Sequence, residues 1–164
     1  MQRADHPRAI SCILTGQPNV GALMSLCEEN YARLVRLIPD LAARSGHAMS
    51  CIPDGPALYL EIEEQARFTT SVRLTYRFPS AGQRHPDPDA RLRVYHDARQ
   101  IEVIDLRQRT LPVRGQNQSS ALALKWQANL FIAKWLTYCL LQGHRFETGA
   151  RARRSAVARA SICP

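Results

Sequence analysis

The chain has 164 residues and a formal net charge of +8, and its 20 arginines far outnumber its two lysines. That length is enough for one domain with a hydrophobic core, but no GxGxxG, GxxxxGK[ST], HExxH or GxSxG motif is present, so we expect no cofactor and none of the enzyme classes that carry these motifs. The five cysteines are scattered without a CxxC pair, and the N-terminus lacks the apolar run of a signal peptide, which together predict a reducing cytoplasm rather than a disulfide framework or a zinc ribbon.

Residues 1–17 have no clear period, and we expect a flexible arm, in which residues 10–14 are the stretch able to dock, ahead of a single α+β domain over residues 18–146. Asn19 is a suitable N-cap. Apolar residues then recur at three- and four-residue steps, which predicts an amphipathic helix, and Pro39 ends or kinks it. The predicted apolar stripe consists of Val20, Leu23, Met24, Cys27, Tyr31, Leu34, Ile38 and Leu41.

Four stretches in the middle of the chain alternate apolar and polar side chains. Residues 45–56 before them are rich in chain breakers and predict a loop. The two-residue period predicts a half-buried, four-stranded antiparallel meander. Residues 79–90 contain three prolines and predict a solvated loop, in which we expect His85, Asp87 and Asp89 to form no metal site. The predicted strands are residues 58–63, 67–78, 91–96 and 100–106.

Residues 119–143 predict a long helix that starts with a serine N-cap and stops at Gly143. The second half of this helix is apolar on nearly every side, which predicts burial against one face of the sheet. Lys125 and Lys134 argue against a membrane span. Residues 147–164 are rich in arginine and predict a disordered tail.

Polar residues on the apolar sides of these elements form the first candidate site. Each helix carries one amide there, Asn30 in the first and Asn129 in the second, and the strand of residues 91–96 ends at His96, which we expect to point to the same side of the sheet. A cavity surrounded by these groups would be a binding site, while a satisfied buried network explains the same residues. The candidate pocket residues are Asn30, His96, Lys125, Asn129 and, nearby, Cys27.

The opposite face of the predicted sheet forms the second candidate site. Arginines alternate there with hydroxyl and tyrosine side chains, a combination that suits phosphate groups or RNA. Cross-strand ion pairs with glutamates on a solvated face explain the same pattern. The arginines of this candidate anion-binding face are Arg67, Arg73, Arg77, Arg91 and Arg93.

Three stretches together resemble the YqiB-like family, a bacterial family of unknown function. They are LCEENY at residues 26–31 with the LVRLIP that follows, LRVYHDA at residues 92–98, and the helix of residues 125–143. The resemblance covers about residues 18–145, and the motifs occur in the expected order. Because the family has no established activity, the resemblance assigns no catalytic residue to this chain.

These observations favour a cytoplasmic, non-enzymatic binding or adaptor module that holds a partner protein in a helix–sheet groove or on the open sheet face. One alternative is an enzyme or sensor acting on a phosphorylated small molecule or nucleotide, with His96 as acid/base and Arg67 or Lys125 as anion clamp. A second alternative is RNA binding through the basic face and the tail, with an affinity that falls steeply with salt. We expect neither a metal nor a membrane to be involved.

Overall fold

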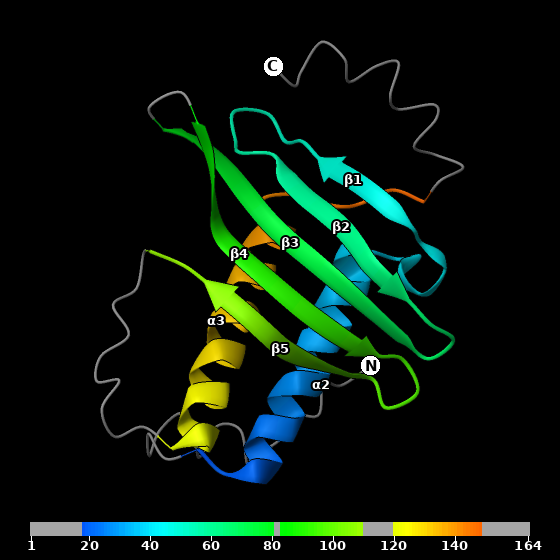
Figure 1. Ribbon diagram of the computed structural model, residues 1–164, viewed down its shortest axis with the longest axis vertical. Coiled ribbons are helices and arrows are strands. Elements are labelled where there is room, and N and C mark those ends of the chain that lie inside the picture. Colours follow the sequence, from blue (N-terminus) through cyan, green and yellow to red (C-terminus); the bar gives the residue numbers. More distant parts are fainter. Residues whose placement is uncertain (1–17, 81–82, 110–119, 149–164) are drawn as a thin grey trace.

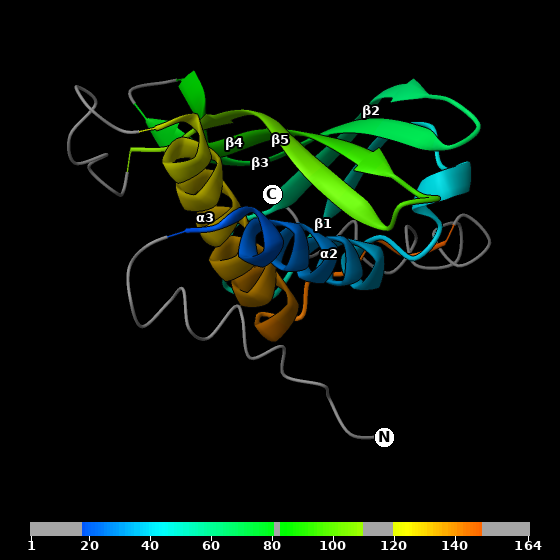
Figure 2. The ribbon, with the colours of Figure 1, turned by 90° about the horizontal axis from the view of Figure 1, so that it is seen from below.

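The computed structural model describes residues 18–80, 83–109 and 120–148. Two helices lie on one face of a five-stranded antiparallel sheet, and no described helix covers the other face, which we call the open face (Figures 1 and 2). The sheet is a meander in the order β1-β2-β3-β4-β5, which confirms the predicted α+β class. The elements are α2 (Val20–Leu37), the short 3-10 helix η1 (Leu41–Ala43), β1 (Gly46–Ser50), β2 (Leu58–Gln65), β3 (Thr69–Ser80), β4 (Gln83–Tyr95), β5 (Gln100–Arg107) and α3 (Ala121–Leu141). The predicted arm and most of the predicted tail lie outside the described residues.

The fifth strand corrects the prediction of four. β1 lies inside the stretch that predicted a loop, and it pairs with β2 from Gly46 opposite Ile62 to Ser50 opposite Leu58. Gly46 has a φ of +74°, a left-handed conformation that suits glycine. Most of the strand is exposed at the sheet edge, so its side chains have no need to alternate. That is why the two-residue period failed to reveal it.

The predicted loop of residues 79–90 is also wrong in extent. β3 and β4 run up to residues 80 and 83, and Pro79 lies opposite Arg84 in their register. The hairpin projects beyond its neighbours (Figure 1), where a proline interrupts no central ladder. Asp89, in the last part of that predicted loop, lies in β4 and accepts two hydrogen bonds from Arg73. Among the residues that the structure describes, no three His, Cys, Asp or Glu side chains gather to hold a metal ion.

The helix termini follow the predicted caps. The Asn19 side chain accepts a hydrogen bond from the Ala22 backbone N–H at 2.8 Å, and the Ser120 side chain accepts one from Ala123 at 3.2 Å. Gly143 has a φ of +88° just after α3. No helix in the described ranges is long and apolar enough to cross a membrane.

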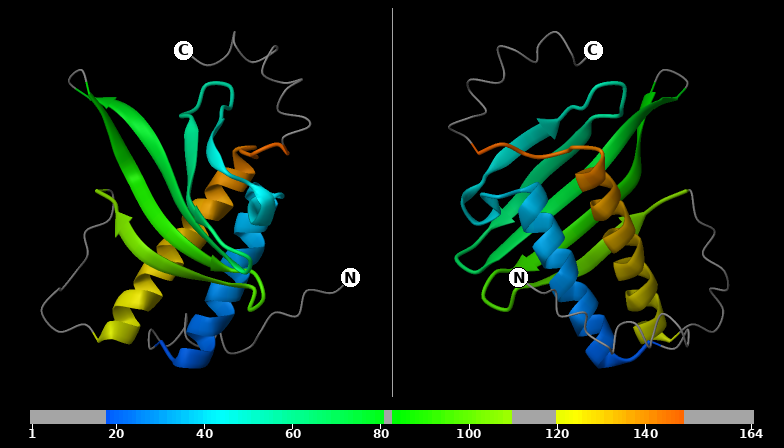
Figure 3. Two further views of the ribbon diagram at one scale, coloured as in Figure 1. Left: turned by 45° about the vertical axis from the view of Figure 1, so that its right-hand side comes forward. Right: turned by 180° about the vertical axis from the view of Figure 1, so that it is seen from behind.

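The buried side of α2 differs from the predicted stripe. Val20 and Met24 are exposed, because α2 packs against α3 as well as the sheet, and this turns the buried side toward the neighbouring helix. Figure 3 shows the two helices side by side across the sheet, and Leu26 packs with Trp126 between them. The buried residues of α2 are Ala22, Leu26, Asn30, Leu34 and Leu37.

The main core lies between the sheet and the C-terminal halves of the helices. Each buried leucine there stabilises the fold by roughly 2 kcal/mol relative to an exposed one. Polar groups in this core are partly paired, since the Tyr76 hydroxyl lies 3.3 Å from Cys139 Sγ. Core residues include Leu34, Leu37, Leu58, Leu60, Val72, Leu74, Leu92, Ile132 and Leu136.

The described cysteines differ in state. Cys27 and Cys139 are free thiols, whereas Cys51 is disulfide-bonded. Burial is the main cause that raises the pKa of Cys139 to about 11, so this thiol is inert at neutral pH. The reducing cytoplasm expected from the sequence stays a prediction.

His144 predicts a dependence of stability on pH. Its ring is buried with Nδ1 3.1 Å from Ser50 Oγ, and burial lowers its pKa below the ordinary value. Since the unfolded ring titrates near 6.5, only the unfolded chain binds a proton as the pH falls below about 6.5. The free energy of unfolding should therefore fall there, by up to roughly 1.4 kcal/mol per pH unit.

Urea unfolding at a series of pH values checks this expectation, with His144→Gln as the comparison. Glutamine keeps a polar partner for Ser50 but does not titrate. The slope of stability against pH should be smaller in the variant than in the wild type. Equal slopes in the two proteins would show that His144 is not the group responsible.

Candidate functional site

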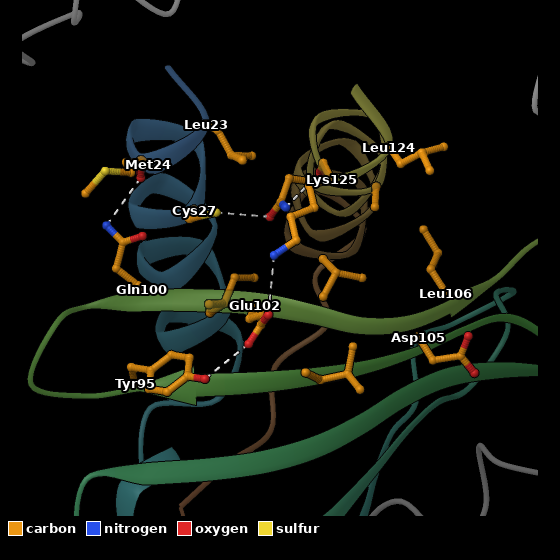
Figure 4. Close-up of a pocket in the computed structure, with 15 residues that line it drawn as sticks. Leu23, Met24, Cys27, Tyr95, Gln100, Glu102, Asp105, Leu106, Leu124 and Lys125 are labelled. Atoms are coloured by element: carbon orange, nitrogen blue, oxygen red, sulfur yellow. Dashed lines mark hydrogen bonds and ion pairs between the residues drawn. The ribbon is translucent and has the colours of Figure 1, made fainter. Parts of the chain in front are cut away.

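A cavity of about 520 Å³ opens between the N-terminal halves of the two helices and the edge strand β5 (Figure 4). We call it the edge groove. Its walls are mainly apolar, a composition typical of binding sites. α2 contributes Leu23, Met24 and Cys27, α3 contributes Leu124, Lys125, Ala128 and Asn129, β5 contributes residues 100–106, and Tyr95 comes from β4.

β5 forms the sheet side of the edge groove and is the last strand of the sheet. Among the described strands it pairs with β4 alone, so the outer side of its backbone has no strand partner within residues 18–80, 83–109 and 120–148. The register places Val103 opposite Leu92 and Asp105 opposite Arg91, which leaves Ile104 between them without a partner. This bulge turns Ile104 outward, and its side chain is 50% exposed.

The helices contribute large apolar side chains to the edge groove that are exposed to solvent. Figure 1 shows that the N-terminal turns of α2 and α3 continue past β5 with no strand in front of them. Met24 on α2 is 56% exposed and Leu124 on α3 is 46% exposed. Figure 4 shows Met24 at the α2 end of the groove and Leu124 at the α3 end. With Ile104 on β5, they line a strand edge that is unpaired among the described residues, and exposed apolar residues at such an edge mark interaction sites.

Four of the five predicted pocket residues meet where the helices touch. Asn30 Nδ2 donates to the backbone O of Asn129 at 2.9 Å and lies 3.4 Å from its Oδ1. Asn129 Nδ2 donates to the backbone O of Lys125 at 2.9 Å, and the Cys27 thiol donates to Asn129 Oδ1 at 3.5 Å. Asn30 is fully buried, while the other three line the edge groove. The amides therefore tie the two helices together at the base of the groove.

The polar groups at the mouth of the groove are paired with one another. Lys125 Nζ lies 3.7 Å from Glu102 Oε1, and the Tyr95 hydroxyl donates to Glu102 Oε2 at 3.1 Å. Burial raises the pKa of the Cys27 thiol, and the nearby Lys125 charge offsets this only in part. A protonated thiol beside a paired lysine is suited to binding rather than to nucleophilic attack.

His96, the fifth predicted pocket residue, lies outside the edge groove. Its Nε2 is 2.8 Å from Thr70 Oγ1, its ring meets Tyr31 edge-on, and burial lowers its pKa. Asn30 and Tyr31 are neighbours on α2, so their side chains point about 100° apart. Asn30 faces α3 while Tyr31 faces His96, which is why the amides and the imidazole are not brought together.

Two arginines of the candidate anion-binding face are paired with carboxylates. Arg73 donates two hydrogen bonds to Asp89, from Nε at 2.8 Å and from Nη2 at 2.7 Å, and the Asp89 side chain is buried. Arg91 lies 2.7 Å from Glu63. These pairs occupy the guanidinium groups that a bound phosphate would need.

The remaining three arginines of that face differ from one another. Arg67 lies in the turn before β3, with its guanidinium over the Phe68 ring, and Arg77 stacks on Tyr59. Arg93 is exposed and has no ion pair within the described chain. Arg73, Arg91 and Arg93 are neighbours in the register of β3 and β4, and of these three only Arg93 lacks an ion pair among the described residues.

Most of the chain matches one known protein family. The family described as "Protein of unknown function (DUF1249)" matches residues 33–145. The chain belongs to this DUF1249 family. A protein of Escherichia coli K12 named "Uncharacterized protein YqiB" is 32% identical over 133 residues, which cover 77% of this chain and 91% of the relative; the protein of the same name in E. coli O157:H7 matches equally. No solved structure matches.

The DUF1249 match and the similarity to YqiB confirm the resemblance to the YqiB-like family. The matched range includes only part of the edge groove. The matched range of residues 33–145 contains β5 and α3 but begins after the part of α2 that lines the cavity. The sequence alone missed Met24, Ile104 and Leu124 as groove residues. One signal was present: Val103 and Ile104 are adjacent apolar residues in an alternating strand, which indicates a bulge.

Proposed function

We propose that this DUF1249 protein is a non-enzymatic binding module that holds an extended segment of a partner protein in the edge groove. The observation that carries the proposal is that three exposed apolar residues, Met24, Ile104 and Leu124, line the groove beside a strand edge that pairs with nothing else in the described chain. Exposed apolar residues beside an unpaired strand mark a surface that another chain can cover.

An extended partner suits the groove better than a helical one. The free side of β5 offers backbone N–H and C=O groups to a strand, and such main-chain bonds supply affinity in strand addition. Alternate side chains of an added strand would point toward α2 and α3, where Met24 and Leu124 offer apolar contact. The Lys125–Glu102 pair at the mouth would favour polar residues at the rim of the partner.

The two alternatives predicted from the sequence have less support. An enzyme or sensor for a phosphorylated ligand would need an acid/base group in the cavity, but His96 bonds Thr70 outside it. Direct RNA binding would need several free arginines on the open face, but two of the five predicted there, Arg73 and Arg91, pair with carboxylates. Both alternatives place the ligand somewhere other than the apolar part of the edge groove, so one binding experiment separates them.

Selection from a displayed library of random peptides tests the proposal. We expect enriched peptides to alternate apolar and polar residues, and we expect Leu124→Asp to weaken their binding about tenfold or more. Leu141→Asp is the matched control, since Leu141 lies on the same helix, is 79% exposed and is outside the edge groove. Titration of a labelled peptide into each variant gives the dissociation constants.

Two results would contradict the proposed function. One is a selected peptide that binds wild type, Leu124→Asp and Leu141→Asp equally well, which would place its site elsewhere. The other is a library that yields no binder while a nucleotide stabilises both variants against heat. That result would favour the enzyme or sensor alternative.

A further inference from the structure

The edge groove has the features of a sheet that is one strand short. β5 ends the sheet that the structure describes and pairs there only with β4. The first turns of α2 and α3 continue beyond it, as the views in Figures 1 and 3 show, and leave Met24 and Leu124 exposed. A strand added beside β5 would lie against these turns and cover both side chains, in the same way as β5 covers the next turns of the two helices.

The chain has a segment attached at the right place to form such a strand. Seventeen residues precede Pro18, the first described residue, and α2 lines the edge groove from Leu23 onward. The apolar residues of that N-terminal stretch are concentrated in AISCIL at residues 9–14. Ile10 and Ile13 are β-branched, and such residues favour strands.

We propose that residues 9–14 occupy the edge groove of the isolated protein as a sixth strand, antiparallel to β5. The proposal rests on the proposed function only in taking the edge groove as a binding site for an extended segment. Gln100 Nε2 donates to the Met24 backbone O at 3.3 Å, so the first residue of β5 lies beside α2. An antiparallel strand would therefore bring Leu14 to the end of β5 that lies beside the second turn of α2.

The connection and the charges fit this direction. Four residue steps separate Leu14 from Pro18 and span at most about 14 Å, and Gly16 between them permits a sharp turn. Arg8 immediately precedes the segment. In the antiparallel direction it comes toward the far end of β5, where Asp105 lines the groove. The sixth strand would also cover an apolar strand edge that otherwise favours aggregation.

With the sixth strand in place, residues 9–14 and a partner segment compete for the same edge of β5. A partner segment must displace residues 9–14 to reach β5, so its apparent affinity is lowered by the fraction of molecules in which the groove is filled. Weakening the internal strand should therefore tighten partner binding without any change in the groove itself.

Backbone amide hydrogen exchange in the full-length chain tests the proposal without any partner. The variant Ile10→Asp/Ile13→Asp places two charges in the segment, and Gln2→Asp/Gln17→Asp places the same charges elsewhere in the N-terminal stretch. We expect amides of β5 to exchange about tenfold faster or more in the first variant than in wild type. The control variant should match wild type, and amides of the central strand β3 should be unchanged in all three.

Two results would overturn the proposal. One is equal β5 exchange in wild type and Ile10→Asp/Ile13→Asp, because the segment then does not protect this edge. The other is β5 protection that rises with protein concentration, because a second copy of the chain is then the occupant. Either result leaves peptide binding in the groove open to its own test. Conversely, faster β5 exchange in Ile10→Asp/Ile13→Asp together with no peptide binder would support the sixth strand but contradict the proposed function.

Discussion

Asn30→Asp is expected to lower the free energy of unfolding by about 3 kcal/mol at neutral pH, although the side chain keeps its size. Asn30 is fully buried, and its Nδ2 faces two oxygens of Asn129 at 2.9 and 3.4 Å. A carboxylate has no proton to donate to either oxygen and is repelled by both. Arg33 lies 3.5 Å from Asn30 Oδ1 and offsets part of the cost. Urea unfolding measures the change.

The pH dependence of this variant gives a second readout. A protonated carboxyl can donate to Asn129, so the folded protein holds the proton more tightly than the unfolded chain, and the pKa of the introduced carboxyl is raised above about 3.9. The deficit should therefore be largest above the raised pKa and shrink as the pH falls through it. Gln127→Glu on the exposed side of α3 is the matched control, with an expected change within about 0.5 kcal/mol. Equal costs for the two variants would contradict the account of the amide bridge.

Arg73→Ala is expected to destabilise the fold by about 2–3 kcal/mol. The guanidinium makes two hydrogen bonds to Asp89, whose side chain is only 8% exposed. Removing the arginine leaves that carboxylate buried without its charge partner. Thermal or urea unfolding of the variant measures the loss.

Arg93→Ala is the control for this prediction. Arg93 is exposed on the same face without an ion pair among the described residues, so its removal should change stability by less than about 0.5 kcal/mol. The comparison separates a structural arginine from a surface one. If Arg73→Ala left stability unchanged but abolished binding of an RNA probe, the open face would regain support as a nucleic-acid site.

The elements that the sequence predicted correctly have strong local signals. α2 and α3 have repeated apolar spacing and side-chain caps at Asn19 and Ser120, which act within a few residues. β1 has no such signal, because its partner is in β2 and most of its side chains are exposed. The long ends of β3 and β4 were missed because prolines there suggest a loop, although the hairpin projects where prolines are tolerated.

The site was predictable only where a helical pattern determined it. Asn30 and Asn129 each lie on the inner side of a helix, so their meeting follows once the helices are neighbours. His96 depended on the rotation of α2, and the packing of α3 turned that helix so that Tyr31 rather than Asn30 faces it. The edge groove depends on how far the helices extend past β5, which is a property of the assembled layers rather than of any local pattern.

The most direct test of the edge groove as a binding site is backbone chemical-shift mapping of the full-length protein with a selected peptide. The account predicts that the largest shifts fall in β5 and in the N-terminal halves of α2 and α3, with slowed amide exchange along β5. Shifts centred on the open face around Arg73 and Arg91, with β5 unaffected, would contradict it.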